Sequence, residues 1–540
     1  MVLDMNLTSV IGVCGLLVFG LPSAHGHWFT YKDSMPKDVL EILNLPGDQR
    51  GGLKDLVRSH VANAAQIPDL GLVGLLELVL AEPDLDVPDF IDEHRPLFMA
   101  RPLVALKLAP TLFTEPVSTG WRVEGVFQRK GTDDVDAQPA SANARNRWLA
   151  LKLVMDVRAA FDDATPVTLQ AAFFESLAKI LVHRADGQSW PSQRAEMLLG
   201  LTSLEEEPTV EYRERRTGGW RPPVIGDDPN VWFFAVPASF EEAKSDGERW
   251  RWALKQLSAL GYAHRNEAIL EIAKVMSSVF NTRFLKGLSG EAPIVGRHPV
   301  PKAGVMALHT LDDDETVAMI GGRLRRIALP PEFSFIDHYK ALALDEAVSD
   351  ETRALAVTQL RYEWSARWQY DRMDALATRM KTKLGSDLPA LESHAVMRGV
   401  GDPKFRFESR PPQIAGRPAF LTATYRNVTK AKFSSRKVDL RKVMDDMDRR
   451  SGKPVEEGKK GLEDWTSLGG LENRLIGEEA EQWLSGPAVE WEAALPPTDH
   501  HWDQQRLVKT PLSEAGLYYV QCEVGTDSVS RTLLWLDDLM

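Results

Sequence analysis

The residues best suited to chemistry by type and spacing stand near the carboxyl end, in the segment Asp499-His500-His501-Trp502-Asp503. Imidazole nitrogens and carboxylate oxygens this close together could hold a divalent metal on a loop. Adjacent histidines in a polar loop are, however, more often solvated side chains without a ligand. We therefore interpret the segment as a polar loop and assign no metal-ligating residue to the chain.

A run of four carboxylates, Asp312-Asp313-Asp314-Glu315, is the second candidate. It lacks the alternating spacing and the central glycine of a calcium-binding loop. A helix is predicted over 314–327, and carboxylates at the start of a helix stabilise its free amides and the positive end of its dipole. The sequence therefore predicts a helix-start role for this run in preference to calcium binding.

Glycine pairs and tryptophans raise two further possibilities, a phosphate-binding loop and a sugar-binding surface. Gly218-Gly219 and Gly321-Gly322 match no phosphate-binding loop, so we interpret them as loop or helix-end glycines. Four tryptophans could form a platform for a sugar, but positions in a core or lining a groove suit their large apolar surface better. These are Trp250, Trp252, Trp364 and Trp368.

The familiar catalytic motifs are absent from the sequence. It contains no His-Glu-x-x-His, no Cys-x-x-Cys, no Walker loop and no Gly-x-Ser-x-Gly block. Of the two cysteines, Cys14 lies in the apolar amino-terminal segment, and Cys522 alternates with Val520 and Val524. That alternation predicts a buried structural thiol. We expect a protein that is not an enzyme and has no catalytic or cofactor-binding residue.

Length and charge limit the class of protein. A chain of 540 residues with 44% hydrophobic and 26% charged residues is long enough for two to four folded domains. Its net charge of −13 argues against nucleic acid as the partner, because phosphate binding needs clustered Lys and Arg.

The amino-terminal segment has the features of an exported protein. An apolar run over 7–21 is followed by small residues ending at Gly26, which predicts a signal peptide over 1–26. Asp4 and the absence of Lys or Arg before the run leave two alternatives open, a hydrophobic first helix or a wrongly chosen start codon. The run is short for a bilayer span, so we expect no transmembrane segment in the mature chain. We expect the chain to be exported and to be periplasmic or associated with the cell envelope.

Hydrophobic spacing predicts helices over most of the chain between the signal peptide and the last domain. We expect a small helical region over 27–140 and an α-helical domain over 141–400. In the first region, 81–102 is predicted as a loop, 104–113 and 121–128 could pair as strands, and 130–141 is a polar linker. In the second, Ser239 is the predicted N-cap of a helix reaching Ala259, with Glu242 as its capping-box partner. Later helices are predicted over 266–284, 314–327, 335–344, 349–367 and 369–384, and the last two match one tetratricopeptide-like hairpin near 350–384.

The last part of the chain, 404–540, changes to a strand pattern. Alternating segments punctuated by Gly and Pro predict an antiparallel β-sandwich, with a charged insertion at 441–487 that we interpret as short helices on a solvated loop. The strands beginning at Ala419 and Lys432 are expected to pair with each other. Further strands are predicted over 489–495, 515–524 and 530–539.

Short residue blocks in this region carry a family resemblance. They are Tyr425-Arg426-Asn427-Val428, Val438-Asp439-Leu440, Gly516-Leu517-Tyr518-Tyr519-Val520 and Asp537-Asp538-Leu539, together with a Trp491 strand ending in Leu495-Pro496. In this order they resemble the macroglobulin-type, immunoglobulin-like domain of bacterial, planctomycete-type alpha-2-macroglobulins. The segments around Trp250 and Ala307 resemble the helical region that precedes this domain in that family.

The resemblance implies an endopeptidase inhibitor that traps proteases. The sequence has no Cys-x-Glu-Gln block for a thioester and no recognisable bait segment. We therefore expect a non-catalytic amino-terminal portion of such an inhibitor, with proteases and a separately encoded remainder of the macroglobulin as partners. The alternative is a self-contained envelope binding or scaffold protein built from helical and immunoglobulin-like domains.

Overall fold

A computed structural model provides the structure of the chain. It describes residues 27–46, 49–81, 85, 87–113, 119–123, 126–128, 138–141, 143–182, 224–225, 234–283, 285, 295–297, 301–384, 400–408, 411–451, 475–525 and 528–538. The predicted signal peptide therefore lies outside the described residues. Two compact units make up the chain, one of Met1–Asn281 with Asp314–His338 and the other of Thr282–Asp313 with Tyr339–Met540. Within the described residues, no helix combines the length and apolarity needed to cross a bilayer.

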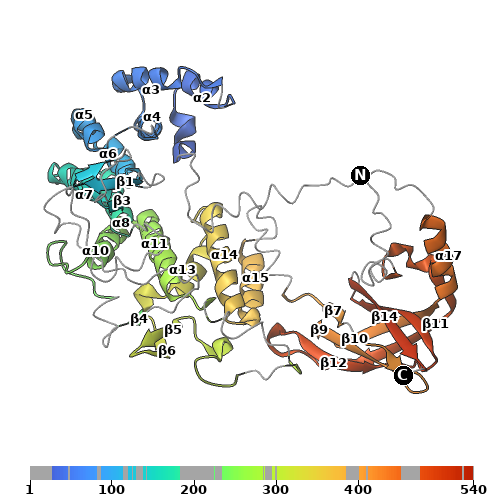
Figure 1. The fold of residues 1–540 in the computed structure, drawn as a ribbon. Coiled ribbons are helices and arrows are strands. Elements are labelled where there is room, and N and C mark those ends of the chain that lie inside the picture. The colour runs from blue at the N-terminus through green and yellow to red at the C-terminus, as the bar shows by residue number, and fades with distance from the viewer. Residues whose placement is uncertain are drawn as a thin grey trace. The chain divides into compact units, whose positions relative to one another are not determined.

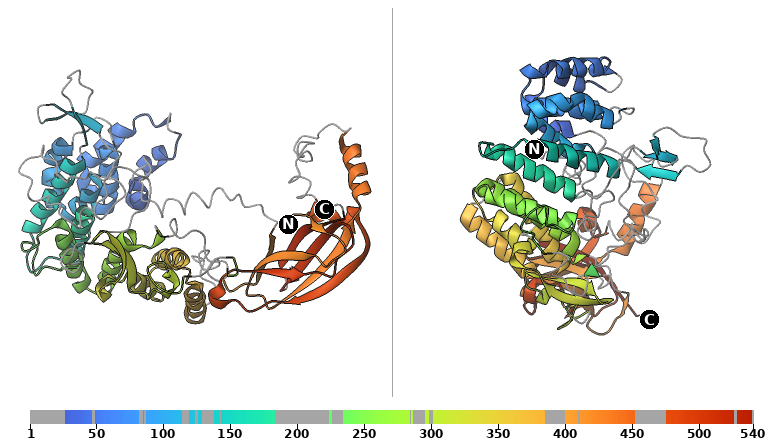
Figure 2. Two further views of the ribbon diagram at one scale, coloured as in Figure 1. Left: turned by 60° about the horizontal axis from the view of Figure 1, so that its bottom comes forward. Right: turned by 90° about the vertical axis from the view of Figure 1, so that its left-hand side faces the viewer.

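The first unit is built mainly from helices that lie beside one another in chain order (Figure 2). Its amino-terminal part contains η1 (His27–Ser34), α2 (Lys37–Leu43), α3 (Leu53–Ala62), η3 (Ala64–Gln66), α4 (Asp69–Leu80), α5 (Val87–Ala100), α6 (Pro102–Leu108) and η4 (Ala109–Thr111). Helix α4 is apolar and buried on nearly all sides, which places it at the centre of this part.

Two predictions for this part are wrong. The expected loop over 81–102 contains α5, which has Pro96 in its interior, and the expected strand over 104–113 is α6 followed by η4. Proline usually breaks a helix, yet Pro102 stands in the first turn of α6, where its missing amide costs nothing. Because buried residues follow one another in α6, namely Val104, Ala105, Leu106 and Leu108, its apolar run shows no clear helical period.

A small sheet and four longer helices complete most of this unit. Strands β1 (Thr119–Val123), β2 (Val126–Gln128) and β3 (Gln138–Ser141) form an antiparallel sheet in the order β2-β1-β3, so the predicted strand at 121–128 is a hairpin and the polar linker supplies β3. Helices α7 (Asn143–Ala159) and α8 (Val167–Leu181) follow as predicted, and α10 (Asp246–Ala259) packs on both α8 and α11 (Tyr262–Phe280). Within the predicted α-helical domain, residues 183–223 and 226–233 lie outside the described residues.

The start of α10 differs from the prediction. Its N-cap is Ser245, whose hydroxyl oxygen accepts from the Glu248 amide at 3.2 Å, while the Glu248 carboxylate accepts from the Lys244 amide at 2.5 Å. Ser239 accepts from the Glu242 amide in the same way, but no helix begins there. Both serines fit the Ser-x-x-Glu pattern, so the pattern alone could not separate them.

A β-hairpin replaces the helix predicted over 314–327. Strands β5 (Glu315–Ile320) and β6 (Arg323–Ala328) pair antiparallel, and β4 (Val224–Ile225) adds to β5 in parallel. Gly321 and Gly322, with φ of 55° and 75°, form the two-residue turn, a backbone that favours glycine at both positions. The hairpin is followed by η8 (Pro331–Phe333).

The second unit joins a helical hairpin to a sandwich of strands. The unit boundary falls within α13 (Phe335–Ala343), and α14 (Asp350–Ala366) and α15 (Tyr370–Leu384) then form the predicted pair, drawn as neighbouring yellow helices in Figure 1. One sheet has the order β12-β9-β7 and the other β11-β10-β13-β14-β8. The strands are β7 (Lys404–Glu408), β8 (Gln413–Ile414), β9 (Phe420–Arg426), β10 (Lys430–Val438), β11 (Leu484–Ala494), β12 (Gln504–Lys509), β13 (Gly516–Val524) and β14 (Ser528–Asp537).

An apolar core lies between these two sheets. Leu421, Ala423 and Tyr425 from β9 face Phe433 of β10 and Val520 of β13 within it. The prediction of helical regions followed by a β-sandwich is thus confirmed at the level of architecture. The described strands of the two sheets pair antiparallel, except that β14 pairs in parallel with the short β8.

The expected pairing of β9 with β10 is wrong, since the two strands belong to different sheets. Between them Asn427 has φ of 55°, and its side-chain amide donates to the Val400 carbonyl at 2.8 Å. Val428 beside it is buried in the core. This left-handed residue and its buried neighbour carry the chain across the core, where a tight hairpin was expected.

The charged insertion is more ordered than a solvated loop. It contains α17 (Leu440–Ser451) and η10 (Glu478–Trp483), and Val443, Leu475 and Trp483 pack with Leu517 and Tyr519 of β13 into a second, smaller core. Because successive side chains of a strand alternate, β13 supplies both cores at once. The rest of the insertion, 452–474, lies outside the described residues.

We expect Ser245→Ala to lower the free energy of unfolding by about 1 kcal/mol, the usual contribution of a helix N-cap. Ser239→Ala is the matched control and should change it by no more than a few tenths, because no helix depends on that hydroxyl. Urea unfolding followed by circular dichroism measures both. Equal losses, or a larger loss for Ser239→Ala, would show that the helix start has been misplaced.

Candidate functional site

The turn between α14 and α15, which we call the hairpin corner (Trp364–Gln369), has a distinctive backbone. The Gln369 amide donates to the Trp364 carbonyl at 2.9 Å and the Trp368 amide to the Ser365 carbonyl at 3.3 Å, the bond pattern of a Schellman helix end. The left-handed position of that motif is usually glycine, but here it is Trp368, with φ of 59°. A bulky residue there costs about 1–2 kcal/mol. Burial of the indole, which is 3% exposed, offsets this cost.

Side chains of the hairpin corner hold the segment before β5. The Arg367 guanidinium, fully buried, donates to the Asp312 carbonyl at 3.1 Å. The Gln369 side-chain amide donates to the carbonyls of Leu311 at 2.5 Å and His309 at 3.3 Å. Two side chains of one turn therefore bind three backbone carbonyls, which satisfies polar groups that burial would otherwise make costly.

The hairpin corner also contacts the sandwich. The indole nitrogen of Trp502, just before β12, donates to the Trp368 carbonyl at 2.8 Å in a buried hydrogen bond. Trp502 is 5% exposed and packs edge-on against His309, with ring centroids 4.9 Å apart. One peptide unit of the turn thus joins the helical hairpin to the sandwich within the second unit.

The acidic run Asp312–Glu315 lies at the start of a strand and not of a helix, and Asp313 in it contacts α13, α14 and α15. It precedes strand β5, and Asp313 binds side chains: Lys340 Nζ lies 2.7 Å away, Arg372 pairs with it, and the Trp364 indole donates at 3.4 Å. Burial alone would raise the pKa of Asp313, but the Lys340 hydrogen bond and the Arg372 charge outweigh it and lower the pKa. The helix-start role predicted for this run is wrong, because a hairpin takes the place of the helix.

The two adjacent histidines are part of the same junction. His501 Nδ1 lies 2.8 Å from the Asn427 side-chain oxygen, and His500 Nδ1 lies 3.5 Å from the Asp371 carboxylate on α15. Burial, followed by the charge of His500, lowers the pKa of His309. The predicted polar loop, η11 (Asp499–His501), therefore contacts α15 directly. Sequence reasoning did not connect His309 with it, since nothing in the spacing links segments so far apart.

A cavity of about 610 Å³, which we call the cationic cavity, opens between the hairpin and the sandwich. The Arg361 guanidinium stacks on Tyr362 at 4.6 Å, and that of Arg426 lies 5.9 Å from the ring centroid of Tyr370. Its lining consists of Arg361, Tyr362, Ser365, Tyr370, Met373, Val400, Asp402, Lys404 and Arg426. Arg426 belongs to one of the blocks that carry the family resemblance, but nothing in the sequence indicated that the lining residues come together, because they belong to four separate segments.

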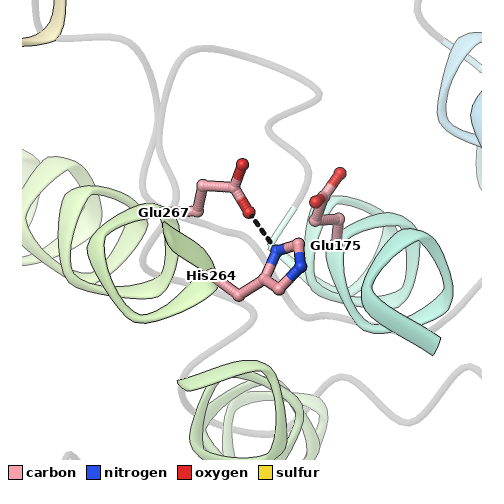
Figure 3. A group of neighbouring side chains, drawn as sticks. All are labelled: Glu175, His264 and Glu267. Atoms are coloured by element: carbon pink, nitrogen blue, oxygen red, sulfur yellow. Dashed lines mark hydrogen bonds and ion pairs between the residues drawn. The ribbon is translucent and has the colours of Figure 1, made fainter. Parts of the chain in front are cut away.

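The first unit contains a group with the ligand types of a metal site, shown in Figure 3. His264 and Glu267, in the first turns of α11, lie beside Glu175 of α8, and their ligand atoms are all within 4.8 Å of one another. His264 Nδ1 is 2.9 Å from the Glu267 carboxylate, but Lys107 Nζ is 2.7 Å from Glu175. Because Lys107 already neutralises one carboxylate, we interpret the group as an ion-pair network joining α6, α8 and α11.

The remaining candidates are structural. Cys522 is fully buried in the sandwich core, and burial, with a smaller effect from Glu523, raises the pKa of its thiol to about 12. Trp250, Trp364 and Trp368 are buried, and Trp252 packs edge-on against Phe174 and Phe240. Gly218-Gly219 lies outside the described residues.

We expect Asp313→Asn to destabilise the second unit by about 1–3 kcal/mol at pH 7, because charged hydrogen bonds to Lys340 and Arg372 are lost. The folded pKa of Asp313 lies below its unfolded value, so this stabilisation is present above about pH 4 and is lost as the pH falls through the folded pKa. Asp312→Asn is the control, since that side chain is 78% exposed. Urea unfolding at pH 7 and pH 3 tests this, and an Asp313→Asn effect that does not shrink in acid would contradict it.

No model of a known protein family, no curated protein and no solved structure matches the chain. The proposals for function therefore rest on the geometry of the hairpin corner and of the cationic cavity, and on the residue blocks in the sandwich.

Proposed function

We propose that the chain is a non-catalytic structural part of an alpha-2-macroglobulin-like endopeptidase inhibitor. The observation that supports this proposal is the joint at Trp368, a buried hydrogen bond from the Trp502 indole to the Trp368 carbonyl. This bond connects the two-sheet sandwich to the helical hairpin. A protease trap works by moving domains against one another, and a rigid joint transmits such motion. The blocks that resemble macroglobulins fall on or next to β9, β10, β11, β13 and β14 of this sandwich.

The proposed partners and location follow from the same resemblance. Proteases would meet the chain together with a separately encoded remainder of the macroglobulin, in the periplasm or at the cell envelope. The sandwich would be a macroglobulin-type, immunoglobulin-like domain that docks the next domain of the assembly. The support for this lies in the order of the residue blocks and in the two-sheet architecture.

A second candidate is a self-contained envelope binding or scaffold protein. The cationic cavity favours it, because its lining comes from one unit of one chain. A ligand could therefore be held there without any other protein.

We expect the full chain, immobilised and exposed to an envelope fraction, to retain an endopeptidase or a macroglobulin-type protein identified by mass spectrometry. Trp502→Phe should weaken that retention severalfold, because it removes the hydrogen bond to Trp368 while keeping an aromatic ring. Trp535→Phe is the control, since Trp535 is 48% exposed on β14. Retention of neither class, or turnover of a hydrolase substrate by the pure chain, would refute the proposal.

A further inference from the structure

We propose that the cationic cavity binds a small organic anion, held by its carboxylate or phosphate group. Three cationic side chains, Arg361, Lys404 and Arg426, line it against one carboxylate, Asp402. The cavity is open to one side, and its volume of about 610 Å³ is in the range of small-molecule sites. This inference deepens the second candidate function and does not depend on protease inhibition.

The strand register places two of the cations opposite each other. Lys404 of β7 and Arg426 of β9 are direct partners across an antiparallel pair. Like charges in this position repel and destabilise a sheet. The Asp503 carboxylate, 3.8 Å from Arg426 Nε, offsets part of this repulsion, and an anion between or beside the two cations would relieve the rest.

The guanidinium groups at the cavity are incompletely paired. Arg361 Nε is buried without a hydrogen-bond partner, and its guanidinium stacks on Tyr362. Arg426 Nε lies 3.8 Å from the nearest Asp503 oxygen, which is too long for a hydrogen bond, and its Nη1 reaches the His501 carbonyl only at 3.5 Å. Guanidinium groups bind both carboxylate and phosphate groups through paired N–H donors, so incompletely paired guanidinium groups beside a cavity are suited to either anion.

The rest of the lining fits the body of an organic molecule. Tyr362, Tyr370, Met373 and Val400 provide aromatic and aliphatic surface beside the cations. Apolar walls with a few convergent polar groups are typical of small-molecule sites. The ligand we expect therefore has a charged end and an apolar or aromatic end.

Isothermal titration calorimetry of the full chain with phenyl phosphate, benzoate, inorganic phosphate and benzyl alcohol tests the site. We expect at least one aromatic anion to bind, more weakly at high salt, and the neutral benzyl alcohol to bind at least tenfold less tightly. Stronger binding of phenyl phosphate or of benzoate identifies the anionic group, and binding of inorganic phosphate as tight as phenyl phosphate would show that the apolar lining plays no part. The proposal would be overturned if benzyl alcohol bound as tightly as the anions. It would also be overturned if no anion bound at concentrations up to about 10 mM.

Variants locate the binding. Arg361→Met and Lys404→Met should each lower the affinity for the anion about tenfold, which is the usual effect of losing one charged hydrogen bond. Arg406→Met is the matched control, because it removes the same charge from β7 but lies outside the cavity and pairs with Glu408. Arg361→Met and Arg406→Met should unfold at temperatures close to that of the unmodified chain, and Lys404→Met at the same or a slightly higher temperature because it removes the repulsion with Arg426. Thermal unfolding checks this. A loss in Arg406→Met as large as that in Arg361→Met would assign the effect to general charge and refute the site.

Discussion

The left-handed residue at the hairpin corner is the constraint on which the second unit depends. A helix that simply continued past Ala366 would bond its own carbonyls and offer none to another element. With Trp368 at positive φ, the chain reverses, and the Trp368 carbonyl accepts from Trp502. The neighbours Arg367 and Gln369 are then directed at the carbonyls of the 309–312 segment. One strained residue therefore fixes the relative positions of three segments that are distant in sequence.

A buried ion pair supports the same helix. Glu363 of α14 is completely buried, and Arg283 pairs with it at 3.1 Å. Burial raises the pKa of Glu363 more than the charges of Arg283 and Arg367 lower it. Such a pair adds little net stability, but removing either partner leaves a buried group unsatisfied, so it specifies which segment must lie against α14.

The sequence is most informative where spacing is regular and least informative where tertiary contacts decide. Helices α14 and α15 and strands β13 and β14 show clear periods, and each is found as expected. Strands β7 and β12 escape prediction because they are short and polar, with only Phe405, Phe407, Leu507 and Val508 as apolar residues. The choice between Ser245 and Ser239 as a helix start depends on tertiary packing, which no local pattern contains.

The candidate site is less accessible from the sequence than the fold. The two histidines stand out as a pair, but their partners Asn427 and Asp371 come from other elements. The cations of the cavity are ordinary surface residues until β7 pairs with β9 and α14 packs beside them. Spacing along the chain carries no signal for groups that only topology brings together.

One edge of the smaller sheet is covered at its start by the chain itself. Strand β12 is an edge strand, and Val295 bonds along it in parallel, donating to the Asp503 carbonyl at 2.9 Å and accepting from the Gln505 amide at 2.8 Å. The contact is so close that a Cβ on Gly296, which has φ of 91°, would lie 2.7 Å from the Gln505 carbonyl oxygen. If this cover were cut or displaced, the freed backbone groups at the start of β12 would extend the edge on which Leu507 is already exposed, and the strand would become a template for strand addition by a second molecule. Damage to these few residues would then be expected to cause fibrous aggregation before it caused loss of the fold.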